Sequence, residues 1–272
     1  MQTKYKIEVA VLIVFLGAIL FWLFSGQNEN APLSSDATLV VGMELKFPPF
    51  ETIDEEGNPA GVSVELAQAL GQKMGREVEI RSLDWAGLIP ALQTRNIDMI
   101  ISSMSITEER LESINFSDEY AKSDITLAVY KDAPITHYSE LDKEEYTVAV
   151  KLGTIGEMWA MANLENATIK SFTEVSAGLL DVNNGQSTAF IYDPLSLIEG
   201  TQNLSNIKLL LDPLPGTQGW GVGVRKDDTA LLSEINEALA QVKADGFFDE
   251  MREKYLKEEV EKYESYGLDY FF

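Results

Sequence analysis

The stretch IDMIISSMSITEER, residues 97–110, decides the fold, because an apolar strand gives way to a polar turn and then to a helical segment. IDMII is typical of a buried β-strand. SITEERLE (105–112) is typical of the start of a helix, with Ser105 and Glu108 spaced as a capping box. The serines therefore stand where a strand ends and a helix begins. In an open α/β sheet, ligands bind at this edge.

The same stretch carries residue types that suit an anion. A helix N-terminus offers free backbone N–H groups and a partial positive charge. Arg110 follows one and a half turns later, and its guanidinium can bind a carboxylate in a bidentate manner. By itself this pattern is weak, since a capping box followed by a surface arginine is common.

The segments around this stretch alternate between β-rich runs and helical patterns, which predicts βα units on mostly parallel sheets. The alternation begins at residue 38 and resumes after residue 145, so two α/β lobes are expected, with a single doubly wound domain as the alternative. SDITLAVYKD (123–132) would carry the chain between the lobes, and GTQGWGVGV (216–224) would carry it back before two amphipathic helices. Two crossings make a hinge, and a cleft between hinged lobes is a natural ligand site.

The first residues differ from the rest, because two lysines precede a sixteen-residue apolar run from Val9 to Phe24. This layout is that of an export signal or a membrane anchor, and its length does not choose between them. We favour an uncleaved anchor formed by residues 7–24, with the remainder exported to the periplasm or the outer face of the cell membrane. The expected segments are 1–26 (signal peptide or anchor), 27–37 (linker), 38–121 (lobe 1, first part), 122–219 (lobe 2) and 220–272 (lobe 1, C-terminal part).

Composition excludes several classes of function. The chain has 44 acidic and 21 basic residues, a formal net charge of −23 that repels phosphate backbones, so nucleic acid is not an expected partner. It has no cysteine, and therefore no disulfide, thiolate metal site or nucleophilic thiol. No metal site and no cofactor are expected.

Several short motifs occur in an order and spacing that resemble a known family. They are FPPF (47–50), DWAGLIPALQ (84–93), IDMIISSMSITEER (97–110), FSDEY (116–120), VAVKLGT (148–154) and YD (192–193). Together they resemble bacterial extracellular solute-binding proteins of family 3, the amino-acid-binding proteins of ATP-driven (ABC) importers, over about residues 38–258. The resemblance implies a type II periplasmic-binding-protein fold, with two α/β lobes joined by a two-strand hinge, here preceded by an N-terminal apolar helix.

The resemblance implies roles for the serine-rich turn. In the family, this turn and the arginine hold the α-carboxylate and part of the α-ammonium of a free L-amino acid. Here those roles fall to Ser103, Ser105 and Arg110, with Ser102 at the start of the same turn.

Residues of the second lobe complete the binding of both ligand charges in the family. Thr154 and the backbone at Ile155 would reach the carboxylate, and Asp193 would pair with the ammonium. This division agrees with physical expectation, since a zwitterion that leaves water needs partners for both of its charges.

The residues around the ligand's side chain give conflicting signals. Phe47 and Trp85 match aromatic positions that flank it in relatives, although both also suit a core. Glu44 matches an acidic residue of histidine- and lysine-type binders, while Lys151 matches a lysine of the glutamine type. If Glu44 and Lys151 pair, a neutral hydrogen-bonding side chain is favoured; if Lys151 points away, Glu44 selects arginine, lysine or histidine.

Two positions depart from the family pattern. Ser63 stands where an aspartate is common, and Ile155 where threonine or glycine is common. Neither touches the expected carboxylate clamp, but both weaken any transfer of side-chain specificity, and Ile155 would narrow the pocket.

The expected protein is a non-enzymatic, monomeric binding protein that delivers a polar or cationic L-amino acid to the permease subunits of an ABC importer. Two alternatives remain open. One is an enzyme resembling the cyclohexadienyl or arogenate dehydratases of the same fold, with Glu44 or Glu157 as the acid. The other is a tethered amino-acid sensor read by a partner protein.

Overall fold

The computed structural model describes residues 38–272 except residues 123, 217–218 and 269–271. By its internal contacts the chain divides into residues 1–34 and 35–272, and the fold described below belongs to the second unit. The expected signal or anchor, the linker and the apolar helix lie outside the described residues. Within the described part, no helix combines the length and apolar character needed to cross a bilayer.

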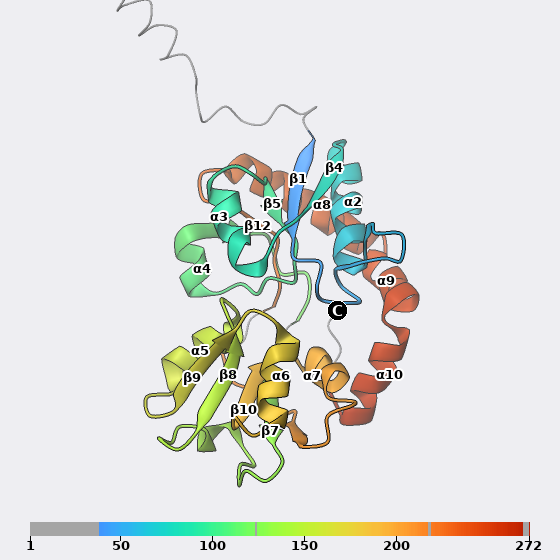
Figure 1. Ribbon diagram of the computed structural model, residues 1–272. Helices are drawn as coiled ribbons and strands as arrows, with labels where there is room; N and C mark the ends of the chain where they lie inside the picture. The colour runs from blue at the N-terminus through green and yellow to red at the C-terminus, as the bar shows by residue number, and fades with distance from the viewer. Residues whose placement is uncertain (1–37, 123, 217–218, 269–271) are drawn as a thin grey trace, which may run out of the picture. The chain divides into compact units, whose positions relative to one another are not determined.

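The first lobe is built on a five-stranded sheet with the order β4-β1-β5-β12-β6 (Figure 1). β1 runs parallel to β4 and β5, whereas β12 is antiparallel to β5 and β6. β12 comes from the chain after the second lobe, so this sheet is completed by a returning segment. The strands are β1 (Leu39–Met43), β4 (Val78–Ser82), β5 (Met99–Ile100), β6 (Ile114–Phe116) and β12 (Gly223–Arg225).

The second lobe is built on another five-stranded sheet, with the order β11-β7-β10-β8-β9. β8 is parallel to β9 and β10, and β7 is antiparallel to β10 and β11. β8 and β10 are almost fully buried, as expected for strands covered on both faces. The strands are β7 (Thr126–Tyr130), β8 (Thr147–Lys151), β9 (Thr168–Phe172), β10 (Ala189–Tyr192) and β11 (Ile207–Leu210).

Helices follow most of the parallel strands and cover the sheets. Those of the first lobe are α2 (Val62–Met74), α3 (Leu88–Gln93) and α4 (Glu108–Ser113), with a 3-10 turn η1 (Trp85–Gly87) and a small hairpin of β2 (Thr52–Ile53) and β3 (Pro59–Ala60). Those of the second lobe are α5 (Ile155–Asn163), α6 (Val175–Asn183) and α7 (Pro194–Gly200), with a 3-10 turn η2 (Tyr138–Glu140).

Three helices close the chain, where the sequence pattern predicted two. They are α8 (Thr229–Ala244), α9 (Phe247–Tyr255) and α10 (Lys257–Tyr266). Gly246 separates the first two, because its φ of 80° is left-handed.

The capping box predicted from Ser105 and Glu108 is wrong. Helix α4 begins at Glu108, and Thr107 is its N-cap, with its hydroxyl accepting the backbone N–H of Arg110 at 3.1 Å. Ser105 lies before the helix because its backbone pairs with Trp220 in an isolated antiparallel bridge. A segment distant in the sequence therefore keeps Ser105 extended.

Helix α10 lies beside α7 of the second lobe (Figure 1), although it continues directly from the helices of the first lobe. Lys262 of α10 forms a 2.6 Å ion pair with Glu199 of α7. Leu195 of α7 also belongs to the same buried apolar core as Val260 and Tyr263 of α10. The C-terminal helix therefore contacts both lobes.

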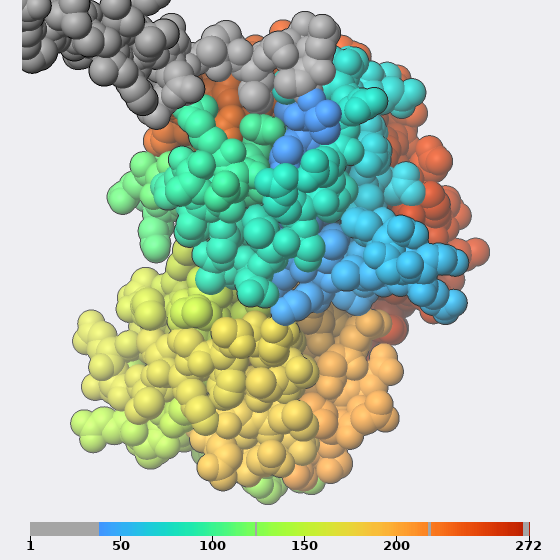
Figure 2. All heavy atoms as spheres, turned by 45° about the horizontal axis from the view of Figure 1, so that its top comes forward, coloured from blue at the N-terminus to red at the C-terminus, as the bar shows by residue number. Residues whose placement is uncertain are grey.

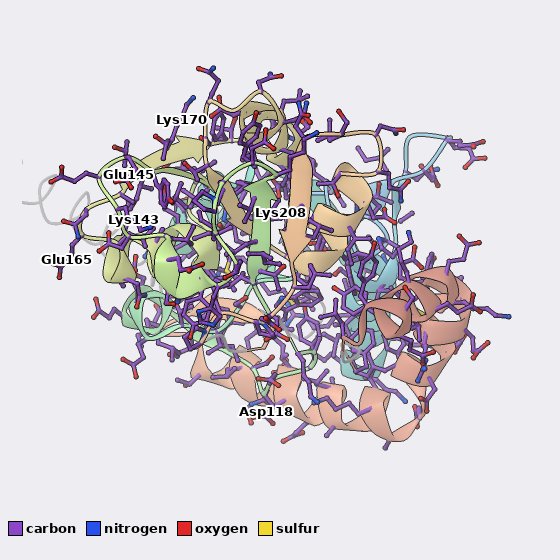
Figure 3. All side chains as sticks on the ribbon, turned by 90° about the horizontal axis from the view of Figure 1, so that it is seen from below. Asp118, Lys143, Glu145, Glu165, Lys170 and Lys208 are labelled. Carbon is purple, nitrogen blue, oxygen red and sulfur yellow. The ribbon has the colours of Figure 1, made fainter. Side chains whose placement is uncertain are left out.

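Charged side chains of both signs are exposed on the outside of the protein. Charged side chains such as Lys143, Glu145, Glu165 and Lys170 are exposed on the second lobe and project outward (Figure 3).

Gly61 allows the start of α2 and the segment at Pro49 and Phe50 to approach closely. It has φ 110° and ψ 177°, a conformation essentially restricted to glycine. The following residues Val62 and Ser63 donate their N–H groups to the carbonyls of Pro49 and Phe50, at 3.2 and 2.7 Å. This close pairing sets the start of α2 against the segment that leads to Glu51.

We expect Gly61→Ala to destabilise the fold more than Gly57→Ala. A Cβ at Gly61 would lie 2.5 Å from the carbonyl oxygens of Pro49 and Phe50, whereas one at Gly57 (φ 89°) meets nothing within 4 Å. Gly57→Ala should therefore cost only the backbone strain, about 1–2 kcal/mol, and Gly61→Ala should cost several kcal/mol. Urea unfolding of both variants measures the difference, and equal losses would contradict the close approach.

Candidate ligand-binding site

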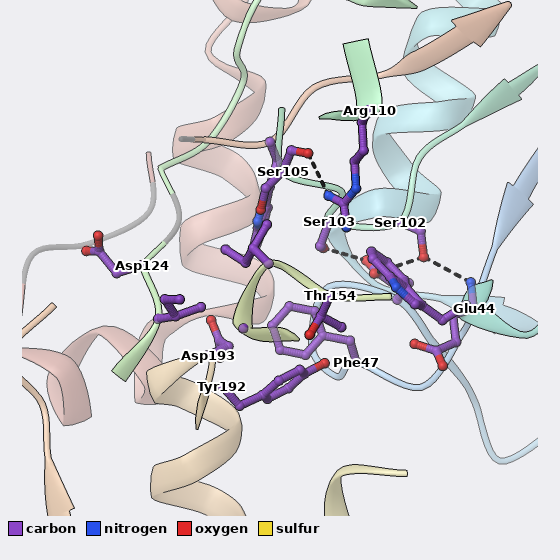
Figure 4. Close-up of a pocket in the computed structure, with 16 residues that line it drawn as sticks. Glu44, Phe47, Ser102, Ser103, Ser105, Arg110, Asp124, Thr154, Tyr192 and Asp193 are labelled. Carbon is purple, nitrogen blue, oxygen red and sulfur yellow. Dashed lines mark hydrogen bonds between the residues drawn. The ribbon is translucent and has the colours of Figure 1, made fainter. Parts of the chain in front are cut away.

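A pocket lies between the two lobes, at the carboxyl ends of several strands (Figure 4). On the face shown in Figure 2 the lobes meet without a wide opening. All of the predicted site residues except Lys151 line this pocket. Its lining consists of Glu44, Phe47, Glu51, Trp85, Ser102, Ser103, Ser105, Arg110, Asp124, Ile125, Thr154, Ile155, Gly156, Tyr192, Asp193 and Trp220.

Arg110 brings a buried positive charge to the pocket. Its side chain comes from α4, and the residue is only 3% exposed. Its described acceptors are uncharged, since Nη1 donates to the carbonyl of Ser105 at 2.6 Å and Nη2 to the carbonyl of Gly153 at 3.0 Å. Desolvation lowers the pKa of Arg110 to about 10. A guanidinium with five donors still has three N–H groups for an anion.

Asp193 brings a carboxyl from the opposite side of the pocket (Figure 4). It follows β10 and caps α7, with Oδ1 accepting the N–H of Ser196 at 3.0 Å. Its Oδ2 is buried and has no hydrogen-bond partner among the described residues. Burial, reinforced by the negative charge of Asp124, raises the pKa of Asp193 to about 7. This oxygen is a ready acceptor for a cationic donor.

The serine-rich turn surrounds a carboxyl that the sequence analysis missed. Glu51 is 1% exposed, and its Oε2 accepts the hydroxyls of Ser63 and Ser103 at 2.6 and 2.9 Å. The hydroxyl of Ser102 lies 3.3 Å from Oε1 and accepts the N–H of Glu44 at 2.9 Å. Burial raises the pKa of Glu51 to about 8. The one available signal was an acidic residue directly after the apolar FPPF.

Glu44 and Lys151 pair across the cleft, which answers the question that the sequence left open. Lys151 Nζ lies 2.6 Å from Glu44 Oε2, and the two side chains are 4% and 6% exposed. Lys151 Nζ also lies 5.7 Å from the centre of the Trp85 ring and 5.9 Å from that of Tyr192. The Glu44–Lys151 ion pair thus closes one end of the pocket, and the charges of its two side chains neutralise each other.

The remaining predicted residues form walls. Phe47 packs against Phe50 and Trp220, with ring centroids 5.0 and 5.9 Å apart. Thr154 is the N-cap residue of α5, and its hydroxyl donates to the carbonyl of Lys151 at 2.8 Å. Ile155 follows it and lines the pocket.

Five other lining residues were not predicted from the sequence, namely Asp124, Ile125, Gly156, Tyr192 and Trp220. Tyr192 stood in the quoted YD motif, but only its neighbour was assigned a role. Glu157, one candidate acid for an enzyme, does not line the pocket, because its carboxylate accepts the N–H of Gly153 and the hydroxyl of Ser171 within the second lobe.

The carbonyl oxygen of Gly153 joins the lobes beside the pocket. Both Trp85 Nε1, at 2.9 Å, and Arg110 Nη2, at 3.0 Å, donate to it from the first lobe. Lys46 and Glu174 form a further cross-lobe pair at 2.8 Å on the surface. The structure is therefore that of a closed cleft.

Two α/β lobes closed over a pocket of this kind define a type II periplasmic binding protein. Residues 39–258 match the bacterial extracellular solute-binding proteins, family 3, and the chain belongs to this family. It is 28% identical over 239 residues to the L-cystine-binding protein TcyJ of Escherichia coli K12, covering 88% of this chain and 90% of the relative. It is also 28% identical over 257 residues to an L-arginine-binding protein of Pseudomonas aeruginosa, covering 91% and 97% of the two chains.

Solved structures show the same architecture. An ancestral amino acid-binding protein described as a precursor of cyclohexadienyl dehydratase superposes with a TM-score of 0.71 at 33% identity, covering 80% of this chain and 94% of the other. An ancestral arginine-binding protein bound to glutamine superposes with a TM-score of 0.71 at 34% identity, covering 80% and 97%. The chain is thus a solute-binding protein by family, and it shares its fold with proteins that bind amino acids.

We expect the ligand-free protein to lose stability as the pH rises through the pKa of Asp193. This pKa is raised from 3.8 to about 7, so the folded state holds a proton that the unfolded state releases. The stabilisation is complete below about pH 4 and is lost as the pH rises to about 7. The loss is on the order of 2–4 kcal/mol.

Urea unfolding at pH 4.5 and pH 7.5 measures this dependence. Asp193→Asn removes the titration, so the variant should lose less stability than the wild-type protein between the two pH values. Identical pH dependence in both proteins would contradict the assignment of the buried proton to Asp193.

Proposed function

We propose that this chain is the substrate-binding component of an ABC amino-acid importer and binds a free polar L-amino acid between its lobes. One observation carries the proposal: a single buried pocket contains Arg110, whose described acceptors are all uncharged, and Asp193, whose Oδ2 has no described partner. Buried charges need partners of opposite charge. The α-carboxylate and α-ammonium of an amino acid supply both.

In this proposal the first lobe binds the α-carboxylate through Arg110 and the turn that contains Ser102, Ser103 and Ser105. Thr154 and the backbone N–H of Ile155 contact the same carboxylate from the second lobe. Asp193 accepts the α-ammonium. Because the two charges are held by different lobes, the ligand itself links them and stabilises the closed cleft.

For the ligand's side chain, the Glu44–Lys151 pair favours a neutral hydrogen-bonding group such as the amide of glutamine. A cationic side chain would meet Lys151 at close range and would have to displace it from Glu44. Phe47 and Trp85 would flank the side chain. The named relatives bind cystine or arginine, and an ancestral relative has been solved with glutamine, so related pockets accept several polar side chains.

The proposed partners follow from the family. The closed, ligand-bound protein would dock as a monomer on the permease subunits of the importer, on the extracytoplasmic face, held to the membrane by residues 7–24. No catalytic turnover and no cofactor are part of this proposal.

Arg110→Ala should abolish most of the affinity for every amino acid, because an unpaired buried carboxylate is costly. The expected loss is about 3–5 kcal/mol, or more than a hundredfold in Kd. Isothermal titration calorimetry against the twenty L-amino acids measures it. Arg81→Ala is a matched control, since Arg81 does not line the pocket and its half-buried side chain pairs with Glu79 on β4. Binding that survives in Arg110→Ala would overturn the proposed clamp.

Lys151→Met should change the order of preference among amino acids. Removing the ammonium leaves Glu44 as an uncompensated carboxylate at the end of the pocket, so arginine and lysine should gain affinity relative to glutamine by about tenfold or more. A thermal-shift panel with the wild-type protein and the variant gives both rankings. An unchanged ranking would remove the Glu44–Lys151 pair from the specificity pocket.

A further inference from the structure

The carboxyl of Glu51 connects several separate segments at the wall of the pocket. Ser63 belongs to α2, and Ser102 and Ser103 belong to the turn after β5. All three hydroxyls lie within hydrogen-bonding distance of the Glu51 carboxyl, at 2.6, 3.3 and 2.9 Å. Ser102 also accepts the N–H of Glu44 at the end of β1. One carboxyl thus fixes the position of the proposed anion-binding turn.

The turn needs such support because its backbone is strained. Ser103 has φ 51°, in the left-handed region that non-glycine residues seldom adopt. Residues held in this way persist when the surrounding structure fixes them. The hydroxyl of Ser103 bonds to Glu51 at 2.9 Å, which ties the strained residue to the carboxyl.

The protonation state of Glu51 determines how many serine hydrogens are free. When Glu51 is ionised, the three hydroxyls donate to it and none is left for a ligand. When it is protonated, its O–H can donate to Ser102 Oγ, which has two acceptor lone pairs and uses one for the N–H of Glu44. The hydrogen of Ser102 is then free to point into the pocket.

The negative charge of an ionised Glu51 also opposes binding of the ligand's carboxylate. Its described hydrogen-bond partners are uncharged hydroxyls, and it lines the same pocket as Arg110. An ionised Glu51 would repel an incoming carboxylate, whereas a protonated one would not. Burial raises its pKa to about 8, so the neutral form predominates at neutral pH.

We propose that Glu51 is a positioning residue of the amino-acid site, which in its protonated form holds the Ser102–Ser103 turn and leaves a serine hydroxyl hydrogen free for the ligand's carboxylate. The inference rests on the proposed function and deepens it, because it assigns the upper pH limit of binding to a residue outside the predicted clamp. The other titratable groups that act on Glu51 or are acted on by it are Glu44, which is paired with Lys151, and the buried phenols of Tyr120 and Tyr192.

The test is the pH profile of affinity, measured by titration calorimetry of the full-length chain with L-glutamine and, in parallel, L-arginine. In the wild-type protein, Kd should rise about tenfold per pH unit above pH 8, since ionisation of Glu51 opposes binding. Glu51→Gln keeps the size and hydrogen-bonding capacity but does not titrate. Its Kd should rise by less than about twofold between pH 8 and pH 9.

Ser63→Ala provides a second variant that does not depend on the stability of Glu51→Gln. Ser63 contacts Glu51 but does not line the pocket. Loss of its hydroxyl disfavours the ionised carboxylate, so the alkaline loss of affinity should move to higher pH. The ligand's own ammonium titrates in every variant, and its contribution cancels in the comparison.

The outcomes separate this inference from the function on which it rests. A wild-type protein that binds no amino acid at any pH would overturn both. A wild-type protein that binds at pH 7, combined with an equal alkaline loss of affinity in Glu51→Gln and an unmoved profile in Ser63→Ala, would overturn the role of Glu51 alone. The role of Glu51 is supported if the affinity of Glu51→Gln no longer falls above pH 8, or if the fall begins at a higher pH in Ser63→Ala.

Discussion

In the closed state the carbonyl oxygen of Gly153 joins the lobes at the pocket itself, because it receives hydrogen bonds from Trp85 and Arg110 of the opposite lobe. Gly153 follows β8 with φ 72°, so the carbonyl is presented by a left-handed turn that glycine adopts without strain. Both donors also line the ligand pocket. Closure of the lobes and formation of the binding site are therefore a single structural event.

Several ionisable side chains are buried near this acceptor, and they differ in the partners that they have. Glu44 and Lys151 neutralise each other, Glu51 is surrounded by hydroxyls, and Arg110 and Asp193 keep unused hydrogen-bonding capacity. Burial of charge destabilises a fold unless each charge finds a partner. The uncompensated groups mark where a ligand supplies what the protein lacks.

Much of the fold could be predicted because strand and helix periods are local signals, and the two sheets follow the predicted alternation. The errors have nonlocal causes. Ser105 was expected to cap a helix, but its backbone pairs with Trp220. Glu51 was missed because the serines it contacts are 12 to 52 residues away, and the pairing of Glu44 with Lys151, 107 residues apart, stayed open for the same reason. Local pattern placed the serine turn and Arg110 at the edge of a sheet, and the resemblance to the family implied the other pocket residues, but neither showed which charges would pair.

Helix α10 lies mostly beyond the region shared with the family, which ends at residue 258, and yet it contacts both lobes through Lys262, Val260 and Tyr263. Any rotation that separates the lobes must either pull α7 away from α10 or bend the chain at Leu256, where α9 gives way to α10. The C-terminal helix therefore ties the two lobes together in addition to the two segments that connect them, and a separation of the lobes would have to break the Lys262–Glu199 ion pair or change the backbone at Leu256.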